Sequence, residues 1–241
     1  MNAIETRDLT KKYGGLTAVD HMNLRIGEGE LFALLGLNGA GKTTAIKMLT
    51  CLIRPTAGDA VLLNDSVKDK PQAVKQKVNV SPQETAVAPN LTVSENLALM
   101  AGIYGQGRET AQQSAREMSL RFGLEGVLGQ RAKTLSGGMQ RRLSIAMALI
   151  SKPRILFLDE PTLGLDVLAR RELWASVRQL KGEVTIVLTT HYLEEAEALC
   201  DRVGVMAKGR LTAVGTAEEL MEKTNTGSLE DAFVALSGGA L

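Results

Sequence analysis

Hydrophobic and polar residues follow different periods in different parts of the chain. Residues 3–9 and 18–26 alternate apolar and polar side chains, which predicts strands with one buried face, separated at Gly14-Gly15. Residues 31–35 are entirely apolar and lie between glycine-containing turns, as expected of a strand buried on both faces. A helix is predicted at residues 42–52, followed by a break at 55–58.

The middle of the chain, residues 92–150, has a helical pattern. Ser94 is the predicted N-terminal cap of its first helix, and a second helix is predicted at 111–122. The last helix follows Ser136-Gly137-Gly138, where apolar residues recur at helical spacing from Leu143 to Ile150.

Strand-like runs return in the last third, at residues 154–158, 184–189 and 202–206, with helices predicted between them at 167–180 and 192–199. Such alternation favours a parallel sheet covered on both faces, so we predict the α/β fold class. The expected single domain has a core at 1–87 and 151–225 and an inserted helical lobe at 88–150. A short helical tail is expected at 226–241, where Leu229, Phe233 and Leu236 share one face.

Composition narrows the class of protein. The 241 residues can bury a core without disulfides, so Cys51 and Cys200 are expected to be reduced and structural. A net charge of +1 argues against a nucleic-acid partner, and Arg141-Arg142 is interpreted as a solvated helix face. Because no apolar run approaches the ~18 residues of a membrane span, any such span is expected on another chain.

The most specific motif is GLNGAGKTT at residues 36–44, which matches G-x-x-x-x-G-K-[ST] between a predicted strand and a predicted helix. Its glycines let backbone amides turn toward phosphate oxygens. Lys42 is expected to reach the β- and γ-phosphates and the Thr43 hydroxyl to ligate Mg²⁺. The motif indicates a nucleotide without separating kinases, GTPases and ATPases. The predicted nucleotide-binding residues here are Gly36, Asn38, Gly39, Gly41, Lys42, Thr43 and Thr44.

Two carboxylates follow the apolar run at 154–158. Asp159 can hold the Mg²⁺ shell, and Glu160 can polarise a water for in-line attack on the γ-phosphorus. His191 follows the next predicted strand, where it can contact the γ-phosphate and hold Glu160 and the water in place. These positions predict a hydrolytic site at one edge of the sheet.

Two other residues are less specific. Gln83 ends the short run VNVSPQ, and its side-chain oxygen can ligate Mg²⁺ or approach the water. Tyr13 precedes a glycine turn, where its ring can stack on adenine or be an ordinary edge aromatic. The residues alone leave both alternatives open.

The motifs occur along the chain as GLNGAGKTT, Gln83, LSGGM, ILFLDE, GLD and His191. Together they resemble the ATP-binding-cassette ATPases over essentially the whole chain. The resemblance implies a P-loop NTPase core with a mostly parallel sheet, an N-terminal antiparallel β subdomain and an inserted α-helical lobe. It implies ATP as substrate with Mg²⁺, and two domains paired head to tail, so that Ser136 and Gly138 act on the ATP of the other copy through an anion-binding helix N-terminus.

Individual roles follow from the same resemblance. Tyr13 corresponds to the adenine-stacking residue and Gln83 to the glutamine that faces the metal and a membrane partner. Glu160 corresponds to the catalytic base, His191 to the switch residue, and Asp166 to the residue that communicates across the dimer. The fifth signature residue is Met139 where the family most often has Gln. LSGGMQRR, HYLEEAE and SLEDAFVALSG are similar to the multidrug and polysaccharide exporter branch that includes daunorubicin-type ATPases.

We therefore expect the ATPase subunit of an exporter, cytoplasmic and peripheral on the inner face of the cell membrane. A separate polytopic transmembrane subunit is expected to dock near Gln83 and the helical lobe, and the second ATPase domain to be an identical or paralogous chain. The alternatives are an importer ATPase, a cassette ATPase that acts on DNA or ribosomes, and a monomeric P-loop kinase in which Ser136–Gly138 is a plain turn.

Overall fold

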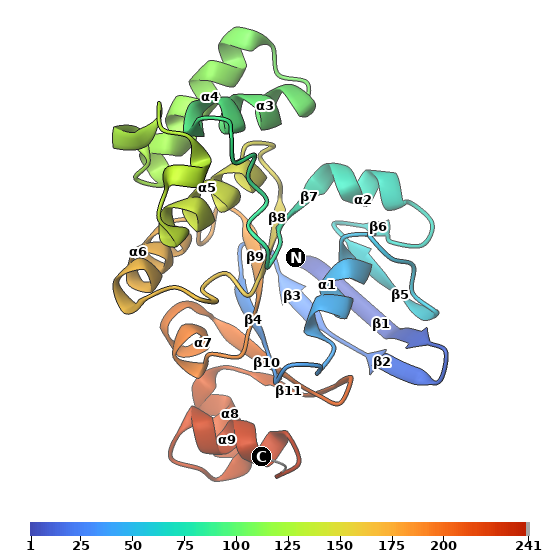
Figure 1. The fold of residues 1–241 in the computed structure, drawn as a ribbon. Helices are drawn as coiled ribbons and strands as arrows, with labels where there is room; N and C mark the ends of the chain where they lie inside the picture. Colours follow the sequence, from blue (N-terminus) through green and yellow to red (C-terminus); the bar gives the residue numbers. More distant parts are fainter. Residues whose placement is uncertain (240–241) are drawn as a thin grey trace.

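The computed structural model describes residues 1–239, in which two β-sheets lie between a helical lobe and a C-terminal pair of helices (Figure 1). In this part of the chain one sheet is antiparallel, with the order β2-β1-β5-β6 and with β3 also paired to β1. The other has the order β11-β10-β4-β9-β8-β7 and is parallel except for β11. The strands are β1 (Asn2–Tyr13), β2 (Leu16–Met22), β3 (Arg25–Gly27), β4 (Leu31–Leu35), β5 (Ala57–Leu62), β6 (Asp65–Ser66), β7 (Val78–Ser81), β8 (Ile155–Asp159), β9 (Thr185–Thr190), β10 (Arg202–Ala207) and β11 (Arg210–Gly215).

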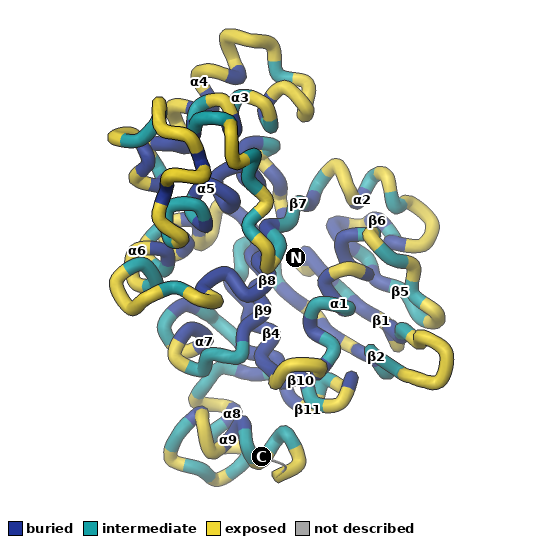
Figure 2. The backbone as a smooth tube through the Cα atoms, viewed as in Figure 1, coloured by how far each residue is buried: buried dark blue, intermediate teal, exposed yellow. Residues whose placement is uncertain are grey.

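The parallel sheet is buried on both faces, which explains the continuous apolar runs of its strands. In β4, Leu31 and Leu35 belong to a core cluster shared with the helices, whereas Phe32 and Leu34 belong to a second cluster shared with the antiparallel sheet. The middle strands β4, β8 and β9 are dark blue in Figure 2 for this reason. A residue at the carboxyl end of one of these strands is therefore held from two sides.

Helices cover the parallel sheet. α1 packs into the cluster between the two sheets, and α5 contacts both β7 and β8. The lobe consists of α3, α4 and the start of α5, while α8 and α9 pack near β11 and β10. The helices are α1 (Lys42–Leu49), α2 (Pro71–Lys77), α3 (Val93–Ile103), α4 (Arg108–Arg121), α5 (Gly137–Leu149), α6 (Val167–Arg178), α7 (Leu193–Leu199), α8 (Ala217–Thr224) and α9 (Leu229–Leu236), with short 3₁₀ turns at Glu125–Val127 and Ala132–Thr134.

The lobe is joined to the sheet by a continuous core. Leu97 of α3, Leu143 of α5 and Leu158 of β8 belong to the same hydrophobic cluster. The lobe and the parallel sheet therefore share one hydrophobic core. The boundaries at 88 and 150 stay a prediction, and residues 240–241 of the predicted tail lie outside the described residues.

Several predicted elements differ from the structure. The predicted strand at 18–26 is wrong as a single strand, because the chain leaves the sheet after Met22 and resumes pairing with β1 at Arg25. Ser94 is not the cap of α3. Thr92 caps it, since its hydroxyl accepts from the Glu95 amide and the Glu95 carboxylate accepts in return from the Thr92 amide.

The sequence analysis also missed β5, β6, α2, β11 and α8. Within residues 1–239, no helix combines the length and apolarity needed to cross a membrane.

Candidate functional site

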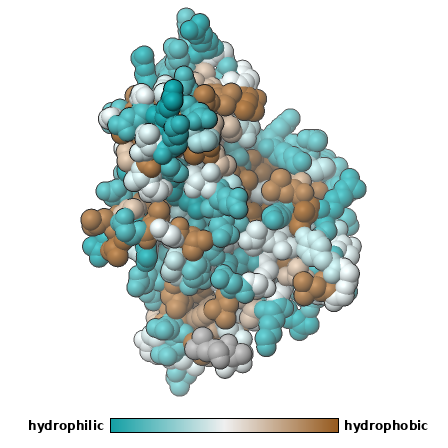
Figure 3. Space-filling model, viewed as in Figure 1, coloured by the Kyte–Doolittle hydropathy of each residue, from teal (hydrophilic) through white to brown (hydrophobic). Residues whose placement is uncertain are grey.

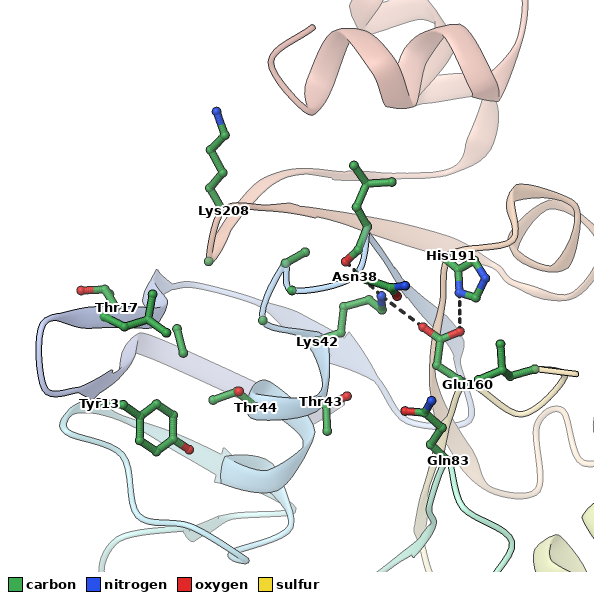
Figure 4. A pocket seen from close by; sticks show the side chains of 18 residues that line it. Tyr13, Thr17, Asn38, Lys42, Thr43, Thr44, Gln83, Glu160, His191 and Lys208 are labelled. Atoms are coloured by element: carbon green, nitrogen blue, oxygen red, sulfur yellow. Dashed lines mark hydrogen bonds and ion pairs between the residues drawn. The ribbon is translucent and has the colours of Figure 1, made fainter. Parts of the chain in front are cut away.

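A cavity of about 740 Å³ opens at the carboxyl ends of the parallel strands. The predicted residues Tyr13, Gln83, Glu160 and His191 line it together with the loop before α1 (Figure 4). Six lining residues escaped the sequence analysis, since no motif marks them: Leu16, Thr17, Ala18, Leu163, Lys208 and Gly209.

The loop between β4 and α1 requires glycine at two places. At Gly36, an added Cβ would lie 2.6 Å from the Met206 carbonyl oxygen. At Gly41 it would lie 2.3 Å from the Ala18 carbonyl oxygen, and the backbone there has a φ of 106°. Only a residue without a side chain permits this approach. The loop thus leads directly into the N-terminus of α1, where the helix dipole favours an anion.

Glu160 lies between a lysine and a histidine. The Lys42 Nζ is 3.1 Å from Glu160 Oε1 and also donates to the Gly36 carbonyl oxygen at 2.7 Å. The His191 Nδ1 is 2.7 Å from Glu160 Oε2. Figure 4 shows the carboxylate between these two partners. Each carboxylate oxygen therefore has one nitrogen partner, and the side chain is held in one orientation.

The backbone of Glu160 is equally constrained. Its φ of 47° is in the left-handed region, and its amide donates to both the carbonyl and the hydroxyl of Thr189. The Thr189 hydroxyl in turn donates to Asp159 Oδ1 at 2.5 Å. Thr189 is a further site residue that sequence reasoning missed, and a hydroxyl at the end of an otherwise apolar strand was the available signal.

The predicted metal ligands lie close together. The Thr43 hydroxyl donates to Asp159 Oδ1 at 3.3 Å, and Gln83 lines the adjoining part of the cavity. A hydroxyl, a carboxylate and an amide oxygen are the hard oxygen donors that Mg²⁺ takes. The residues present therefore fit this ion.

Tyr13 is at the opposite end of the cavity from Glu160 (Figure 4). Its side chain is 48% exposed, and Lys11 Nζ is 5.1 Å from the centre of its ring. The cation orients the ring by interaction with its π face. The remaining ring surface is accessible to a flat ligand.

The other predicted residues do not line this cavity. Ser136 is exposed and caps α5, with its hydroxyl accepting from the Met139 amide at 3.3 Å. Gly138 abuts α6, because an added Cβ would lie 2.8 Å from the Ala169 Cβ. Asp166 caps α6 by accepting from the Ala169 amide at 2.9 Å. Within one chain, the Ser-Gly-Gly turn and Asp166 thus form a second group outside the cavity.

Met139, the departure from the family pattern, is half-buried against the larger hydrophobic cluster. The neighbouring Gln140 donates its side-chain amide to the carbonyls of Ala132 and Leu135. These contacts fix the start of α5 without involving Ser136.

The interpretation of Arg141 as part of a solvated helix face is wrong. Arg141 is 4% exposed, because both sides of α5 are covered from this residue onward. Glu195 is also fully buried, accepts from Trp174 Nε1 at 3.1 Å, and has its pKa raised by burial.

The glycine loop follows β4 and begins a helix, and the acidic end of β8 lies beyond the intervening strand β9. This arrangement defines a phosphate-loop nucleotide-binding protein. A family model described as "ABC transporter" matches residues 19–163. The chain therefore belongs to the ABC transporter family, as an ATPase domain of that family.

Two similar proteins support the assignment of the chain to this family. The chain is 39% identical over 97% of its length to "Probable multidrug ABC transporter ATP-binding protein YbhF" of Escherichia coli (strain K12), but spans only 41% of that protein. It is 43% identical over 94% of its length to "Daunorubicin/doxorubicin resistance ATP-binding protein DrrA" of Streptomyces peucetius, and covers 68% of it.

A solved structure has the same fold. It is a dimeric, post-hydrolysis state of the ATP-binding cassette MJ0796 bound to ADP and Pi. The two chains are 27% identical, with a TM-score of 0.79 over 88% of this chain and 98% of the other.

Proposed function

We propose that the chain pairs with a second copy or a paralogue, that the pair hydrolyses two ATP molecules, and that hydrolysis drives export through a separate transmembrane subunit. One observation carries the proposal. The cavity gathers most of the residues predicted for phosphate and water, whereas Ser136 and Gly138, in a turn at the N-terminus of α5 that can bind an anion, lie outside it. A second chain that presents this turn to the cavity completes the site, and the ADP-bound relative is a dimer.

The chain's own residues account for binding. Backbone amides of the glycine loop and the N-terminus of α1 cradle the phosphates, while Tyr13 stacks on the adenine. Thr43, Asp159 and Gln83 would hold Mg²⁺, which supplies positive charge against the phosphate oxygens.

Glu160 is the proposed general base. The Lys42 ammonium exchanges its bond to Glu160 Oε1 for the β- and γ-phosphate oxygens, which leaves Oε1 to accept a proton. The water oxygen attacks the γ-phosphorus, the bond to the β-phosphate oxygen breaks, and the water proton passes to Glu160. His191 keeps Oε2 bonded throughout, so the carboxylate stays aimed at the water. Ser136 and Gly138 of the second chain stabilise the charge on the γ-phosphate.

A surface on the proposed lobe supports a membrane partner. Leu99 and Ile103 of α3 and Tyr104, which follows the helix, are exposed. Figure 3 shows brown, hydrophobic atoms in the region of α3. We call these three residues the α3 patch. The Tyr104 hydroxyl accepts from Asn79 on β7, the strand that leads to Gln83. A transmembrane subunit bound there would sense the cavity through β7, and would hold the chain at the cytoplasmic face of the membrane. The names of YbhF and DrrA favour a drug-like cargo.

Glu160→Gln tests the shared hydrolytic site. This variant should keep ATP binding, lose at least about 100-fold in turnover, and accumulate as an ATP-bound dimer in size-exclusion chromatography with Mg-ATP. Glu194→Gln, an exposed carboxylate after the neighbouring strand, is the matched control and should behave as wild type. Normal turnover by Glu160→Gln, or a monomer in ATP, would overturn the proposal.

The membrane partner is tested through the α3 patch. In cells that naturally contain the protein, we expect it in the membrane fraction, and we expect the double variant Leu99→Ser, Ile103→Ser to be released from it. The purified double variant should keep wild-type ATP hydrolysis. Equal membrane recovery of both proteins would refute docking at this surface.

A further inference from the structure

The guanidinium of Arg141 is buried against two backbone segments that border the cavity. Arg141 lies just over one turn after Ser136, in the first part of α5. Its Nη1 donates to the Pro82 carbonyl oxygen at 2.6 Å, and its Nη2 donates to the Gln83 carbonyl oxygen at 2.5 Å. The same Nη2 lies 3.4 Å from the Glu160 carbonyl oxygen. One side chain thus joins the start of α5 to the segments after β7 and β8.

Arginine suits this position because its planar fork presents N–H donors in several fixed directions. Its acceptors here are carbonyl oxygens, so the bonds do not require a partner carboxylate to be ionised. Burial lowers the pKa of the guanidinium, and the charges of Asp159 and Glu195 oppose that effect. A buried cation must keep its donors bonded. A shift of either segment therefore displaces α5 as well, or breaks these bonds.

The contact continues a row of polar contacts between α5 and β7. The Asn79 side-chain amide donates to the Ala148 carbonyl oxygen at 2.9 Å, and the hydroxyls of Ser81 and Ser144 are 3.0 Å apart. Arg141 extends this row past the end of β7. The strand end and the helix start are consequently held in one register.

The two ends of this connection belong to different ATP sites in the proposed dimer. Gln83 and Glu160 line the chain's own cavity, whereas Ser136, at the N-terminus of α5, serves the ATP of the second chain. We propose that Arg141 couples the two ATP sites, by moving the Ser-Gly-Gly turn together with Gln83 and Glu160 of the same chain. The inference rests on the shared ATP sites of the proposed function. Arg141 is a positioning residue, since it acts through other residues.

A mixed dimer can distinguish two roles of Arg141: coupling of the two ATP sites, and support of Glu160 in its own chain. A Lys42→Ala chain and a Ser136→Arg chain are each inactive alone in the proposed function. When mixed, they form one working site. The Ser136→Arg chain supplies its Lys42 and Glu160, and the Lys42→Ala chain supplies its Ser136. Arg141→Met is then added to the Lys42→Ala chain only, which lends its turn to that site but does not contribute its own Glu160.

We expect this addition to lower ATP turnover of the mixture about tenfold, within the usual range of coupling between sites. In the otherwise wild-type homodimer, Arg141→Met should bring the Hill coefficient for ATP toward one. If turnover of the mixture is unchanged, and falls only when Arg141→Met is in the Ser136→Arg chain, Arg141 supports its own Glu160 alone and the coupling is refuted. If the unmodified mixture is inactive while wild type is active, the shared site itself fails.

Arg142→Met in the Lys42→Ala chain is the matched control. Arg142 is the next residue of α5, but it contacts Glu172 and the Phe122 carbonyl oxygen, away from the cavity. Its loss should leave turnover of the mixture unchanged. If thermal unfolding shows that Arg141→Met does not fold, Arg141→Lys in the Lys42→Ala chain is used in its place. It keeps the charge but cannot reach all three carbonyls, so turnover should fall partially, and full turnover would refute the inference.

Discussion

His191 Nδ1 and Glu160 Oε2 lie 2.7 Å apart, although the two residues belong to different strand ends of the parallel sheet. A carboxylate only accepts, so the proton of this bond is on His191 Nδ1. The pair therefore sets both the orientation of Glu160 and the tautomer of His191. The His191 ring also lies 4.1 Å from the Tyr192 ring, which restricts its rotation.

His191→Ala should lower kcat for ATP about 100-fold with little change in KM, because Glu160 keeps its place but loses the bond that aims it. Steady-state ATP hydrolysis measures both constants. His21→Ala is a suitable control, since His21 is exposed and bonds only Asp20 among the acidic side chains of the described residues. Unchanged kcat in His191→Ala would show that Glu160 needs no such partner.

Thr189→Val removes a buried hydroxyl while keeping the volume of the side chain. That hydroxyl donates to Asp159 and accepts from the Glu160 amide, so its loss should cost about 1–2 kcal/mol of unfolding free energy and also lower kcat. Thr185→Val is the matched control in the same strand, because its hydroxyl accepts from the Gly29 amide instead. Chemical denaturation measures the unfolding free energy of both variants, and ATP hydrolysis measures their kcat. We expect Thr185→Val to lose stability alone, and equal loss of kcat in both variants would contradict the assigned role.

The elements that the sequence predicted well are those whose burial is periodic. The strands β4, β8 and β9 are apolar on both faces, and α5 follows a glycine turn with apolar residues at helical spacing. The missed elements lack such a signal. α2 buries only Val74, and β5 carries a glycine and an aspartate and pairs with the distant β1. Their structure depends on tertiary contacts rather than on local pattern.

The site residues also divide into those that the sequence predicted and those that it missed. Residues within a motif, such as Lys42 and Glu160, could be predicted because their chemistry and spacing are specific. Arg141, Thr189 and Glu195 were missed, since the contacts of each are with a segment far along the chain. A charged residue on a helix suggests solvent, and only the packing of α5 against β7 reverses that reading for Arg141.

Tyr13→Ala should raise KM for ATP about tenfold and leave kcat nearly unchanged, since stacking on the base binds substrate and transition state alike. Tyr13→Trp, which keeps an aromatic face, should restore the affinity. Tyr104→Ala serves as the control, because this exposed tyrosine lies in the α3 patch and does not line the cavity. If Tyr13→Ala binds ATP normally, Tyr13 is an ordinary edge aromatic.

Glu195 should make stability depend on pH, because burial raises the pKa of its carboxyl above the ordinary value of 4.5 and the nearby charge of Glu160 adds to this rise. Between 4.5 and the folded-state pKa, the folded chain retains a proton that the unfolded chain has lost. The resulting stabilisation is complete below about pH 4.5 and is lost as pH rises through the folded-state pKa. Glu195→Gln cannot ionise, so its melting temperature relative to wild type should rise as pH increases from 4.5, measured by thermal unfolding in a pH series. Glu197→Gln, an exposed neighbour on α7, should show no such trend, and a constant difference between Glu195→Gln and wild type would mean that Glu195 ionises normally in the folded chain.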